Sequence, residues 1–585
     1  MRVWQSIEPS AARAILLLPV LLVCARAQEP ADLILHNGKI VTVDRNFSIA
    51  QAIVVREGRI VAVGDESVVK RYRSSNTIDL HGHAVLPGFD DVHLHLNGDP
   101  PYYVELADAR SIQEIQNLVR AKAQHLDKEA WVTGAGWAED QLEEKRKPTA
   151  KDLDAAAPDN PVVLTRAGGH SVVVNSRALA LAGITRDTPD PARGVIEHLP
   201  NGDPSGVVRE GGGMFMRFTK RPSAAELRDS LVLKIRRLLS LGITSFVLAG
   251  MSIEEWNEWQ AIYRAQGETL PRAAIQIRYP GAERLQAFAH KTGDGDERLR
   301  LGAIKIFVDG GFTGPAAYTI EPYKGQGDYR GKLTMTPQEL YEEMSESHRL
   351  GWQLGLHTIG DGAIQLAVDT FDRILRESPR NDHRHYLPHF SMTPPSETMR
   401  KMAADHIWIA QQPNFTYTLE GRYRDNLEGD RLQLNNPIVT PIKYGIFMCF
   451  SSDILPIGPM VGLYAAVTRK GMSGAVYGPG ERVSMREAIT MYTRNGPYFT
   501  WEENLKGTLE SGKLADMIVF EDDPLTVIPD RLLSAKVQMT IVGGRIVYQA
   551  RPAKGDARET PLHGEEYSGN REKKVLDKHY RKIVN

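Results

Sequence analysis

Two patterns of apolar and polar positions divide this chain. Short runs that alternate apolar and polar residues, such as LILHNGKIVTVD and AIVVREGRIVAVG, occupy residues 32–85. The same texture returns in residues 515–524 and 537–549. Runs of this kind, broken by glycine-containing turns, are typical of strands joined in hairpins. We therefore predict one small β-sandwich domain built from both ends of the chain, residues 28–84 and 505–555.

The middle of the chain alternates short apolar runs with stretches of helical spacing, as in residues 222–242 and 336–351. Strands that alternate with amphipathic helices are typical of a parallel sheet. The candidate strands are residues 85–96, 243–250, 271–279, 302–310, 353–361, 384–390, 406–413 and 445–453. Eight such units predict an α/β fold, a TIM-like (β/α)8 barrel over residues 85–504.

One connection is too long to be a loop. Residues 97–242 separate the first predicted strand from the second, and a structureless segment of that length is not expected in a compact domain. We predict an inserted subdomain over residues 100–215. Because it follows the first strand, it should stand over the carboxyl end of the barrel, where such barrels place their active sites.

The N-terminal segment has the pattern of a secretory signal. Arg2 and Arg13 precede the apolar run AILLLPVLLVC, and Ala25-Arg26-Ala27 follows it. A charged region, a short apolar region and a small-residue cleavage site predict a signal peptide over residues 1–27 and an exported protein, periplasmic or secreted. The alternative is an uncleaved anchor. After cleavage we expect no stable membrane span, since the run is short for a bilayer.

Composition narrows the class of protein. The chain has 585 residues, of which 42% are hydrophobic and 25% charged, values ordinary for a soluble enzyme with room for a barrel and an accessory domain. A net charge of −2 argues against a nucleic-acid partner, which requires a basic face. Cys24 leaves with the signal, so we expect Cys449 to be a packed core residue without a disulfide. We expect residues 556–585 to be a tail, and a homo-oligomer stays open.

Polar side chains stand at the ends of the predicted strands. His93 and His95 lie in PGFDDVHLHL, and residues two apart on a strand share one face. Later strands end with further polar residues, Lys305, Asp309, His357, His389 and Asp453. A parallel barrel directs these ends to one rim. Imidazoles and carboxylates are the ligands of Zn²⁺ and similar divalent ions, so the pattern predicts a metal site.

Each residue also has a structural interpretation when it is taken alone. His357 fits a hydrogen-bonded core histidine, and Asp453, which follows two serines, fits a helix cap. Lys305 is harder to explain in this way, because burial of an unpaired ammonium group is costly. Their joint occurrence at strand ends favours the metal site.

These segments resemble the amidohydrolase superfamily, and within it amidohydrolase family 3, the YtcJ-like metal-dependent hydrolases that include N-substituted formamide deformylases. The motifs that carry the resemblance are PGFDDVHLHL, IKIFVDGGFTG, LHTIGDGAI, RHYLPH, SSD and GTLESGKLADMIVFEDDPL. The inserted WVTGAGW and GGHSVVVNSRAL segments are also similar to that group. The resemblance covers about residues 30–550.

The resemblance implies a ligand set. His93, His95 and Asp453 would bind a first ion, and His357 and His389 a second. Lys305 stands where many relatives carry a carboxylated lysine that bridges two ions. Carboxylation would turn a costly ammonium group into an anionic ligand, and without it a one-ion site stays open. We therefore expect one or two ions, Zn²⁺ or another divalent metal, per chain.

The chain departs from the family pattern at one place. Relatives usually have Ile-Glu-His before the sixth-strand ligand, whereas this chain has Leu387-Pro388-His389. The absent carboxylate would be an outer partner of a ligand, and such partners tune metal affinity. Proline also lacks the N–H that a central strand uses.

The implied reaction is hydrolysis of an amide-type C–N bond in a small molecule, such as an N-acyl or N-formyl compound. Asp453 would act as general base toward a metal-activated water. Two alternatives are hydrolysis of a lactone, carbamate or cyclic ureide at the same site, and an exported barrel that binds a ligand without turnover. The presence of all six ligand positions argues against the second alternative.

Candidate substrate-binding residues lie mainly in the insert. Trp137 would stack on an apolar or aromatic group, and Arg166 and His170 would bind a carboxylate or carbonyl; His170 would also stabilise an oxyanion. Asp309, after the lysine strand, completes this set. The alternatives are core packing for Trp137 and a loop-forming role for Arg166 and His170.

Overall fold

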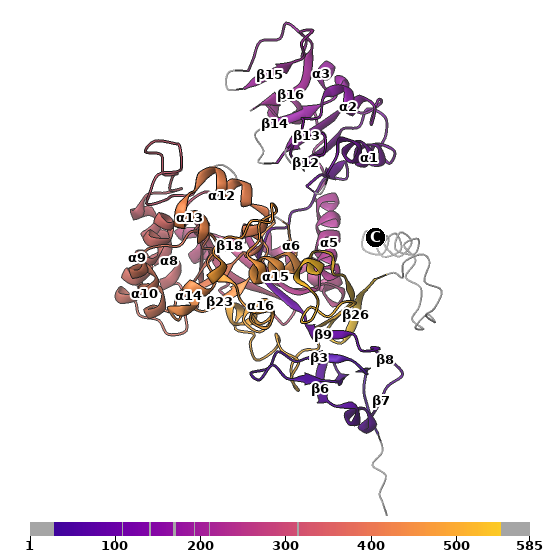
Figure 1. The fold of residues 1–585 in the computed structure, drawn as a ribbon, viewed down its shortest axis with the longest axis vertical. Helices are drawn as coiled ribbons and strands as arrows, with labels where there is room; N and C mark the ends of the chain where they lie inside the picture. The colour runs from indigo at the N-terminus through magenta and orange to yellow at the C-terminus, as the bar shows by residue number, and fades with distance from the viewer. Residues whose placement is uncertain are drawn as a thin grey trace, which may run out of the picture.

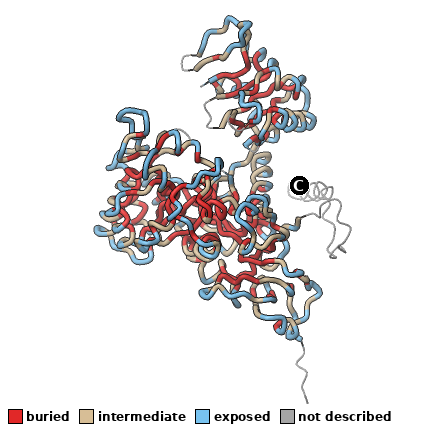
Figure 2. Tube along the Cα trace, in the orientation of Figure 1, coloured by how far each residue is buried: buried red, intermediate tan, exposed pale blue. Residues whose placement is uncertain are grey.

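The computed structural model describes residues 28–550 except 108, 140–141, 168–170, 192–193, 210, 313–314 and 455. The predicted signal peptide, the tail over residues 556–585 and His170 lie outside these described residues. Figure 1 shows three bodies, with a barrel in the middle, a β-rich domain at one end and the insert at the other. Buried residues are concentrated inside each of the three (Figure 2).

The central sheet has eight parallel strands that are neighbours in chain order. They are β10 (Phe89–Leu94), β17 (Ile243–Met251), β18 (Arg272–Arg278), β19 (Leu299–Phe307), β20 (Leu354–His357), β21 (Tyr386–His389), β22 (Trp408–Gln411) and β23 (Met448–Phe450). The ring closes where Leu94 bridges Asp453 in parallel, with Asp453 N donating to His93 O at 2.8 Å. The predicted α/β class and (β/α)8 barrel are confirmed.

Helices cover the barrel, and most of them share one apolar core with its strands. They are α5 (Ala224–Ser240), α6 (Trp256–Gln266), α7 (Ala282–Ala287), α8 (Pro337–Arg349), α9 (Asp361–Glu377), α10 (Ser396–Ala404), α15 (Pro459–Thr468) and α16 (Met485–Tyr492), with four short helices α11 (Asn414–Thr418), α12 (Glu420–Asn426), α13 (Gly429–Gln433) and α14 (Val439–Lys443) before β23. Ser223, Thr336 and Ser484 form reciprocal capping boxes with a glutamate three residues later. These caps satisfy backbone N–H groups that the first helical turn leaves free.

The first predicted strand, residues 85–96, is two strands in different sheets. β9 (Ala84–Pro87) pairs with β24 (Met517–Phe520) of the β-rich domain, and only β10 belongs to the barrel. Gly88 lies between them, and a Cβ there would stand 1.9 Å from Thr244 Oγ1. Glycine is therefore required where the chain changes sheet. The barrel therefore begins at Phe89 and not, as predicted, at residue 85. The prediction missed this boundary because a continuous apolar run does not reveal a change of sheet.

The β-rich domain has two facing sheets and a small parallel pair, β1 (Glu29–Pro30) with β7 (Tyr72–Arg73). One of the facing sheets contains β6 (Arg59–Gly64), β5 (Ala52–Arg56), β2 (Leu33–His36) and β8 (Thr77–Asp79), and the other contains β26 (Arg545–Gln549), β25 (Val537–Val542), β24, β9, β3 (Lys39–Val41) and β4 (Ile49–Ala50). Leu35, Ile53 and Met517 belong to one core that both sheets line. A buried ion pair at 2.7 Å joins Asp516 of this domain to Arg272 at the amino end of β18. The domain therefore sits at the amino end of the barrel strands.

The insert is built on a mixed six-stranded sheet. Its strands, in sheet order, are β11 (Tyr103–Glu105), β12 (Val132–Trp137), β13 (Val162–Arg166), β14 (Ser171–Val174), β16 (Pro204–Arg209) and β15 (Val195–His198). Helices α1 (Ile112–Ala123), α2 (Ala150–Asp154), α3 (Ser176–Ala182) and α4 (Gly213–Met216) accompany it. The chain leaves the carboxyl end of β10, forms this sheet and returns to the barrel through α5, at the end of the molecule remote from the β-rich domain (Figure 1).

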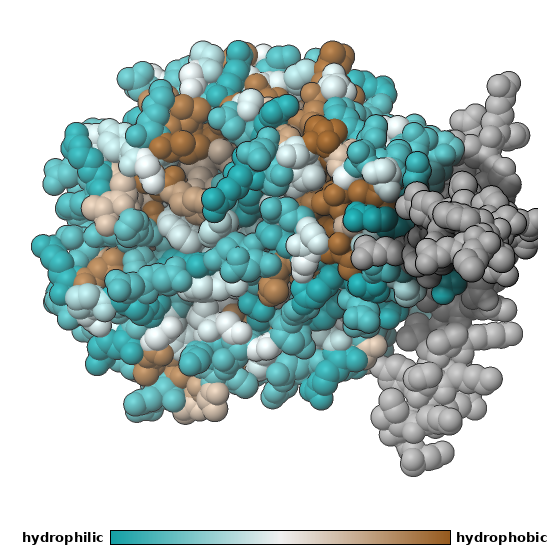
Figure 3. Space-filling model, turned by 90° about the horizontal axis from the view of Figure 1, so that it is seen from below, coloured by the Kyte–Doolittle hydropathy of each residue, from teal (hydrophilic) through white to brown (hydrophobic). Residues whose placement is uncertain are grey.

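The described surface has a largely hydrophilic character. Seen from below, it shows hydrophilic residues with separate hydrophobic patches (Figure 3). Within the described ranges, no helix combines the length and apolar character needed to cross a bilayer. Cys449 is fully buried in β23, as expected for a packed residue.

Candidate metal centre

The carboxyl ends of the barrel strands bring the predicted ligands together. His93 and His95 stand at the end of β10, and Lys305 lies near the end of β19, with the remaining members His357, His389 and Asp453 at the ends of β20, β21 and β23. Within this group, His93, His389 and Asp453 each offer a ligand atom, and these atoms all lie within 4.8 Å of one another. The compact triad draws two residues from the implied first-ion set and one from the second.

The other histidines continue this cluster. His95 Nε2 lies 3.6 Å from Asp453 Oδ1, and the rings of His357 and His389 have centroids 4.3 Å apart. Four imidazoles and one carboxylate thus form a continuous group at one rim. His95 is the more exposed of the β10 pair, with 33% of its side chain accessible, whereas His93 is fully buried.

Two ligand residues have a left-handed backbone. His389 has φ 78° and Asp453 has φ 60°, a region that residues other than glycine seldom adopt. Asp453 is held there by its N–H bond to His93 O and by the preceding Ser452 N, which donates to Asp91 Oδ1 at 3.0 Å. Such conformations persist only where the surroundings enforce them, and they concentrate at functional sites.

Pro388 lies where one strand ladder is interrupted. β21 pairs with β22 through residues 386–389, but it pairs with β20 only at Gly355–Tyr386 and at an isolated Thr358–His389 bridge. This interruption accommodates a residue without an N–H to donate.

The outer partner of His389 comes from the next strand. His389 Nδ1 lies 2.9 Å from Gln412 Oε1, and Gln412 Nε2 donates to Ser451 Oγ at 2.6 Å. Because an amide oxygen only accepts, Nδ1 carries the proton and Nε2 keeps a lone pair. Gln412 thus serves as the outer partner that Pro388 cannot provide. In the sequence, only the position of Gln412 after β22 could have indicated this role.

The buried imidazoles have unused nitrogen atoms. His93 Nδ1, His357 Nε2 and His389 Nε2 are buried without a hydrogen-bond partner. Burial lowers the pKa of all three histidines, and burial with the nearby Lys305 lowers the pKa of His95 to about 4. Neutral imidazoles with free lone pairs are the form that binds a divalent ion, and an unpaired buried nitrogen is costly without one. The donor set therefore fits a metal.

Lys305 and Asp453 complete the electrostatics of the cluster. Lys305 is 1% exposed, and its Nζ lies 3.5 Å from His93 Nε2. Burial lowers the pKa of Lys305 to about 7, opposed by the Asp453 carboxylate. Burial raises the pKa of Asp453 to about 6, opposed by the Lys305 charge.

Asp309 does not occupy the substrate-binding position predicted for it. Its carboxylate is 1% exposed and accepts backbone N–H bonds from Tyr318, Ile359 and Gly360 at 2.8–3.0 Å. His357 Nε2 lies 3.9 Å from Asp309 Oδ1. Asp309 therefore holds the loop that carries His357, and its oxygens are not presented to a substrate.

The aromatic stacking role predicted for Trp137 is wrong. Trp137 is fully buried in the core of the insert, and its Nε1 donates to Leu164 O at 3.1 Å. Arg166 is engaged by Glu139, with Arg166 Nε 2.7 Å from Glu139 Oε2. His170 lies outside the described residues. A tryptophan in a glycine-rich run looks the same in sequence whether it packs or binds.

Comparison with known proteins supports the interpretation of the barrel as a metal-dependent hydrolase. Residues 76–548 match the family described as Amidohydrolase family. The chain is 29% identical to YtcJ of Bacillus subtilis (strain 168), covering 88% of this chain and 99% of that protein. It is 28% identical to N-substituted formamide deformylase of Arthrobacter pascens, covering 88% and 98%. The structure is similar to an uncharacterized metal-dependent hydrolase from Pyrococcus furiosus, with a TM-score of 0.64 and 25% identity over 84% of this chain and 99% of the other.

The fold, the ligand cluster and these matches agree with one another. The family match covers most of the chain, including every strand of the barrel and every predicted ligand. The chain is therefore a member of the amidohydrolase family, a metal-dependent hydrolase that acts on carbon–nitrogen bonds.

Proposed function

We propose that the chain hydrolyses the C–N bond of a small N-acyl or N-formyl compound, with Asp453 as general base. The observation that carries this proposal is the triad of buried His93, buried His389 and partly buried Asp453 at the carboxyl rim. A relative named N-substituted formamide deformylase supports the substrate class. A divalent ion, for which we propose Zn²⁺, lowers the pKa of water toward neutrality and polarises a carbonyl when bound to such ligands.

The chain's own residues manage the proton. Asp453 lies between His95 and His389, 3.6 Å from one and 3.7 Å from the other. From there it accepts a proton from the attacking water and returns it to the nitrogen as the C–N bond breaks. His93 and His389 lie beside this carboxylate, and Gln412 fixes the ring of His389. A lactone would need the same proton transfers with oxygen as the leaving atom, whereas a cyclic ureide, or a carbamate cleaved at its C–N bond, would leave through nitrogen.

Asp453→Asn tests the base. We expect metal content to stay near that of the wild type and kcat to fall by about 100-fold or more, since general acid–base groups contribute about 10²–10⁴-fold. Metal analysis and assays on N-acyl amino acids, N-alkyl formamides and lactones would measure both quantities. Loss of metal with the activity would make Asp453 a ligand only, and near-native kcat would refute the assignment.

We also propose that Lys305 is carboxylated and that the site then holds two ions. Support comes from its burial and from its pKa, lowered to about 7 by that burial, which leaves much of the amine neutral. The neutral Nζ adds to the carbon of CO₂ and releases a proton, giving an anionic oxygen ligand. Native mass spectrometry should show one added CO₂ that Lys305→Met lacks. A wild-type mass without added CO₂, together with two ions bound in Lys305→Met, would contradict the proposal.

We further propose that the protein is exported after cleavage behind Ala27. Arg2, Arg13 and the apolar run that follows support this proposal. N-terminal sequencing of the protein recovered from its native host should begin at Gln28. Recovery of a chain that begins at Met1 would refute it.

A further inference from the structure

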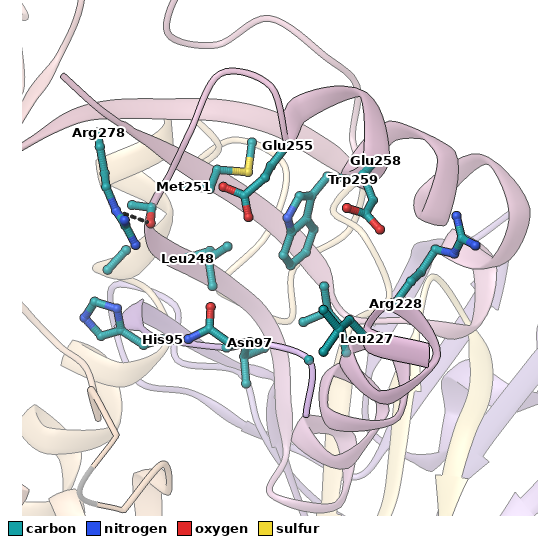
Figure 4. Close-up of a pocket in the computed structure, with 15 residues that line it drawn as sticks. His95, Asn97, Leu227, Arg228, Leu248, Met251, Glu255, Glu258, Trp259 and Arg278 are labelled. Atoms are coloured by element: carbon teal, nitrogen blue, oxygen red, sulfur yellow. Dashed lines mark hydrogen bonds between the residues drawn. The ribbon is translucent and has the colours of Figure 1, made fainter. Parts of the chain in front are cut away.

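One cavity opens beside the ligand cluster. It has a volume of about 230 Å³ and lies between the carboxyl ends of β10, β17 and β18 and helices α5 and α6. Figure 4 shows His95 and Arg278 at one end of it and Arg228 and Glu258 at the other. Because His95 lines both the cavity and the rim, a molecule whose reacting bond lies at the rim can extend into this cavity.

Arg278 lines the same end of the cavity as His95. It ends β18, where it pairs in register with Lys305 of β19, so the two residues stand on neighbouring strands about 4.8 Å apart. Its positive charge contributes to lowering the pKa of His95 and of Lys305. The charge of Arg278 therefore acts directly on the site.

The stem of Arg278 is fixed, whereas its charge is free. Arg278 Nε donates to Gly250 O at 3.0 Å, and a Cβ on Gly250 would lie 3.2 Å from Arg278 Cγ. Glycine at position 250 lets the side chain lie flat against β17. Among the described residues, no carboxylate lies within ion-pairing distance of Arg278, which is exposed. Its two outer nitrogens remain available as a planar fork that suits a carboxylate.

Beyond Arg278 the cavity has a mixed wall. The charged residues Arg228, Glu255 and Glu258 share it with apolar side chains, those of Leu227, Leu231, Leu248, Met251 and Trp259. Typical pockets for whole drug-sized ligands measure about 300–1,000 Å³, so this cavity suits one side chain. A ligand that fits carries an anionic group close to the scissile bond and a side chain that lies along the apolar residues of this wall. In an N-acyl amino acid, one carbon separates the amide nitrogen from both groups.

We propose that the substrate is an N-acyl or N-formyl amino acid, whose carboxylate binds Arg278 and whose apolar side chain enters the cavity. This inference rests on the proposed function and specifies the half of the substrate that leaves as the amine. It moves carboxylate recognition from Arg166, which is paired with Glu139, to the end of β18.

The test compares racemic N-acetyl-leucine with N-acetyl-isopentylamine, an achiral compound that differs from it only in lacking the carboxylate. Wild-type enzyme should have a kcat/KM for the acid about 10- to 100-fold above that for the neutral compound, the range expected of a hydrogen bond to a charged group. Arg278→Met should remove this preference by lowering only the value for the acid, and Arg278→Lys should lie between. Equal loss for both substrates, or a wild type that prefers the neutral one, would overturn the inference while leaving hydrolysis itself intact.

Arg284→Met is the matched control. Arg284 lies on α7, forms an ion pair with Glu254 and lies outside the cavity lining. This variant removes the same charge at a distance, so the preference for the acid should persist. If it falls as much as in Arg278→Met, the preference reflects the general field of the protein and not a binding contact.

A binding measurement separates this inference from the proposed reaction. Calorimetry of N-acetyl-leucine with metal-loaded Asp453→Asn, alone and combined with Arg278→Met, should show a Kd that rises about 10- to 100-fold with the second change. The metal content of both proteins should be equal. If neither substrate is hydrolysed but this shift is present, the proposed reaction fails and the carboxylate site stands; an unchanged Kd refutes the site.

Discussion

Two histidine clusters stand at opposite ends of the same two strands. At the carboxyl ends of β20 and β21, His357 and His389 belong to the rim cluster, where three buried imidazole nitrogens have no partner. At the amino ends, His348 of α8 and His385 form a second cluster with His383. His385 immediately precedes β21, and its Nδ1 accepts the N–H of Leu354, the first residue of β20.

Every ring nitrogen of the amino-end cluster has a partner. His385 Nε2 lies 2.9 Å from His348 Nδ1, and His348 Nε2 lies 2.8 Å from Ser378 O. His383 Nδ1 accepts from His385 N, and its Nε2 lies 3.0 Å from Asp405 O. The bonds fix each tautomer, so these rings are complete without a metal. Unused lone pairs, and not the number of histidines, distinguish a ligand cluster from a structural one.

The largest expected contrast comes from one substitution made at both ends of β21. His389→Leu removes a member of the compact triad, and we expect loss of metal and a fall in kcat/KM of about 10³-fold or more, since a metal contributes several kcal/mol to transition-state stabilisation. Relative to metal-free wild type, His389→Leu should lose less stability than His385→Leu. Metal analysis, steady-state kinetics and urea unfolding would measure these effects, and full metal occupancy in His389→Leu would exclude the triad as the site.

His385→Leu should show the opposite result. It leaves Leu354 N–H and His348 Nδ1 buried without partners, and each such group costs about 1–3 kcal/mol. We expect a loss of about 2–4 kcal/mol in the free energy of unfolding, with kcat/KM per folded molecule close to wild type.

His125→Leu is the control for this loss, because His125 is exposed and its φ is not positive. Its effect on unfolding should stay within about 0.5 kcal/mol, as for most surface substitutions. A metal-dependent rescue of His385→Leu would mean that the amino-end cluster also binds an ion.

The comparison also shows how far the sequence could lead. The pattern H-x-H occurs three times, as His81/His83 at a turn, as His93/His95 and as His383/His385. The last two pairs have opposite roles. Only position relative to a strand end separates them, and the eight strands were predicted well enough to place His93 and His95 at the rim. The fold was accessible because strands and helices have different periods, whereas the change of sheet at Gly88 leaves the apolar pattern unbroken.

Side-chain contacts between strands were less accessible. Gln412 and Arg278 act on the site from the ends of β22 and β18, but a glutamine or an arginine near a strand end is unremarkable in sequence. Trp137 and Asp309 were predicted to bind substrate, but Trp137 packs in a core and Asp309 accepts hydrogen bonds from three backbone amides. Roles of this kind depend on partners far away in the chain, which periodicity does not identify.

A smaller effect should follow from the support of His389. Gln412→Leu removes the acceptor from His389 Nδ1 and leaves the ring free to change tautomer or rotate. We expect metal affinity to fall by about 10- to 100-fold, the usual cost of losing an outer partner of a ligand.

Gln412→Glu is the matched variant for this measurement, because it restores an acceptor of similar shape. Competition with a chelator of known affinity would give both values, and Gln412→Glu should bind metal at least as tightly as wild type. If Gln412→Leu binds metal as tightly as wild type, the Gln412 contact does not support the ligand.

The smallest expected effect isolates one histidine of the amino-end cluster. Burial lowers the pKa of His383 to about 4, whereas an unfolded histidine has a pKa of about 6.5. Below pH 6.5 the unfolded chain therefore binds a proton that the folded chain refuses, so stability falls as the pH drops and levels off below pH 4. Between pH 7 and pH 5.5 this group accounts for about 1 kcal/mol. His383→Gln keeps a donor and an acceptor without titrating, so urea unfolding should show a pH dependence shallower than wild type by that amount. Parallel curves for the two proteins would mean that His383 is protonated in the folded state, and the amino-end cluster would then not be the neutral, fully bonded counterpart of the rim.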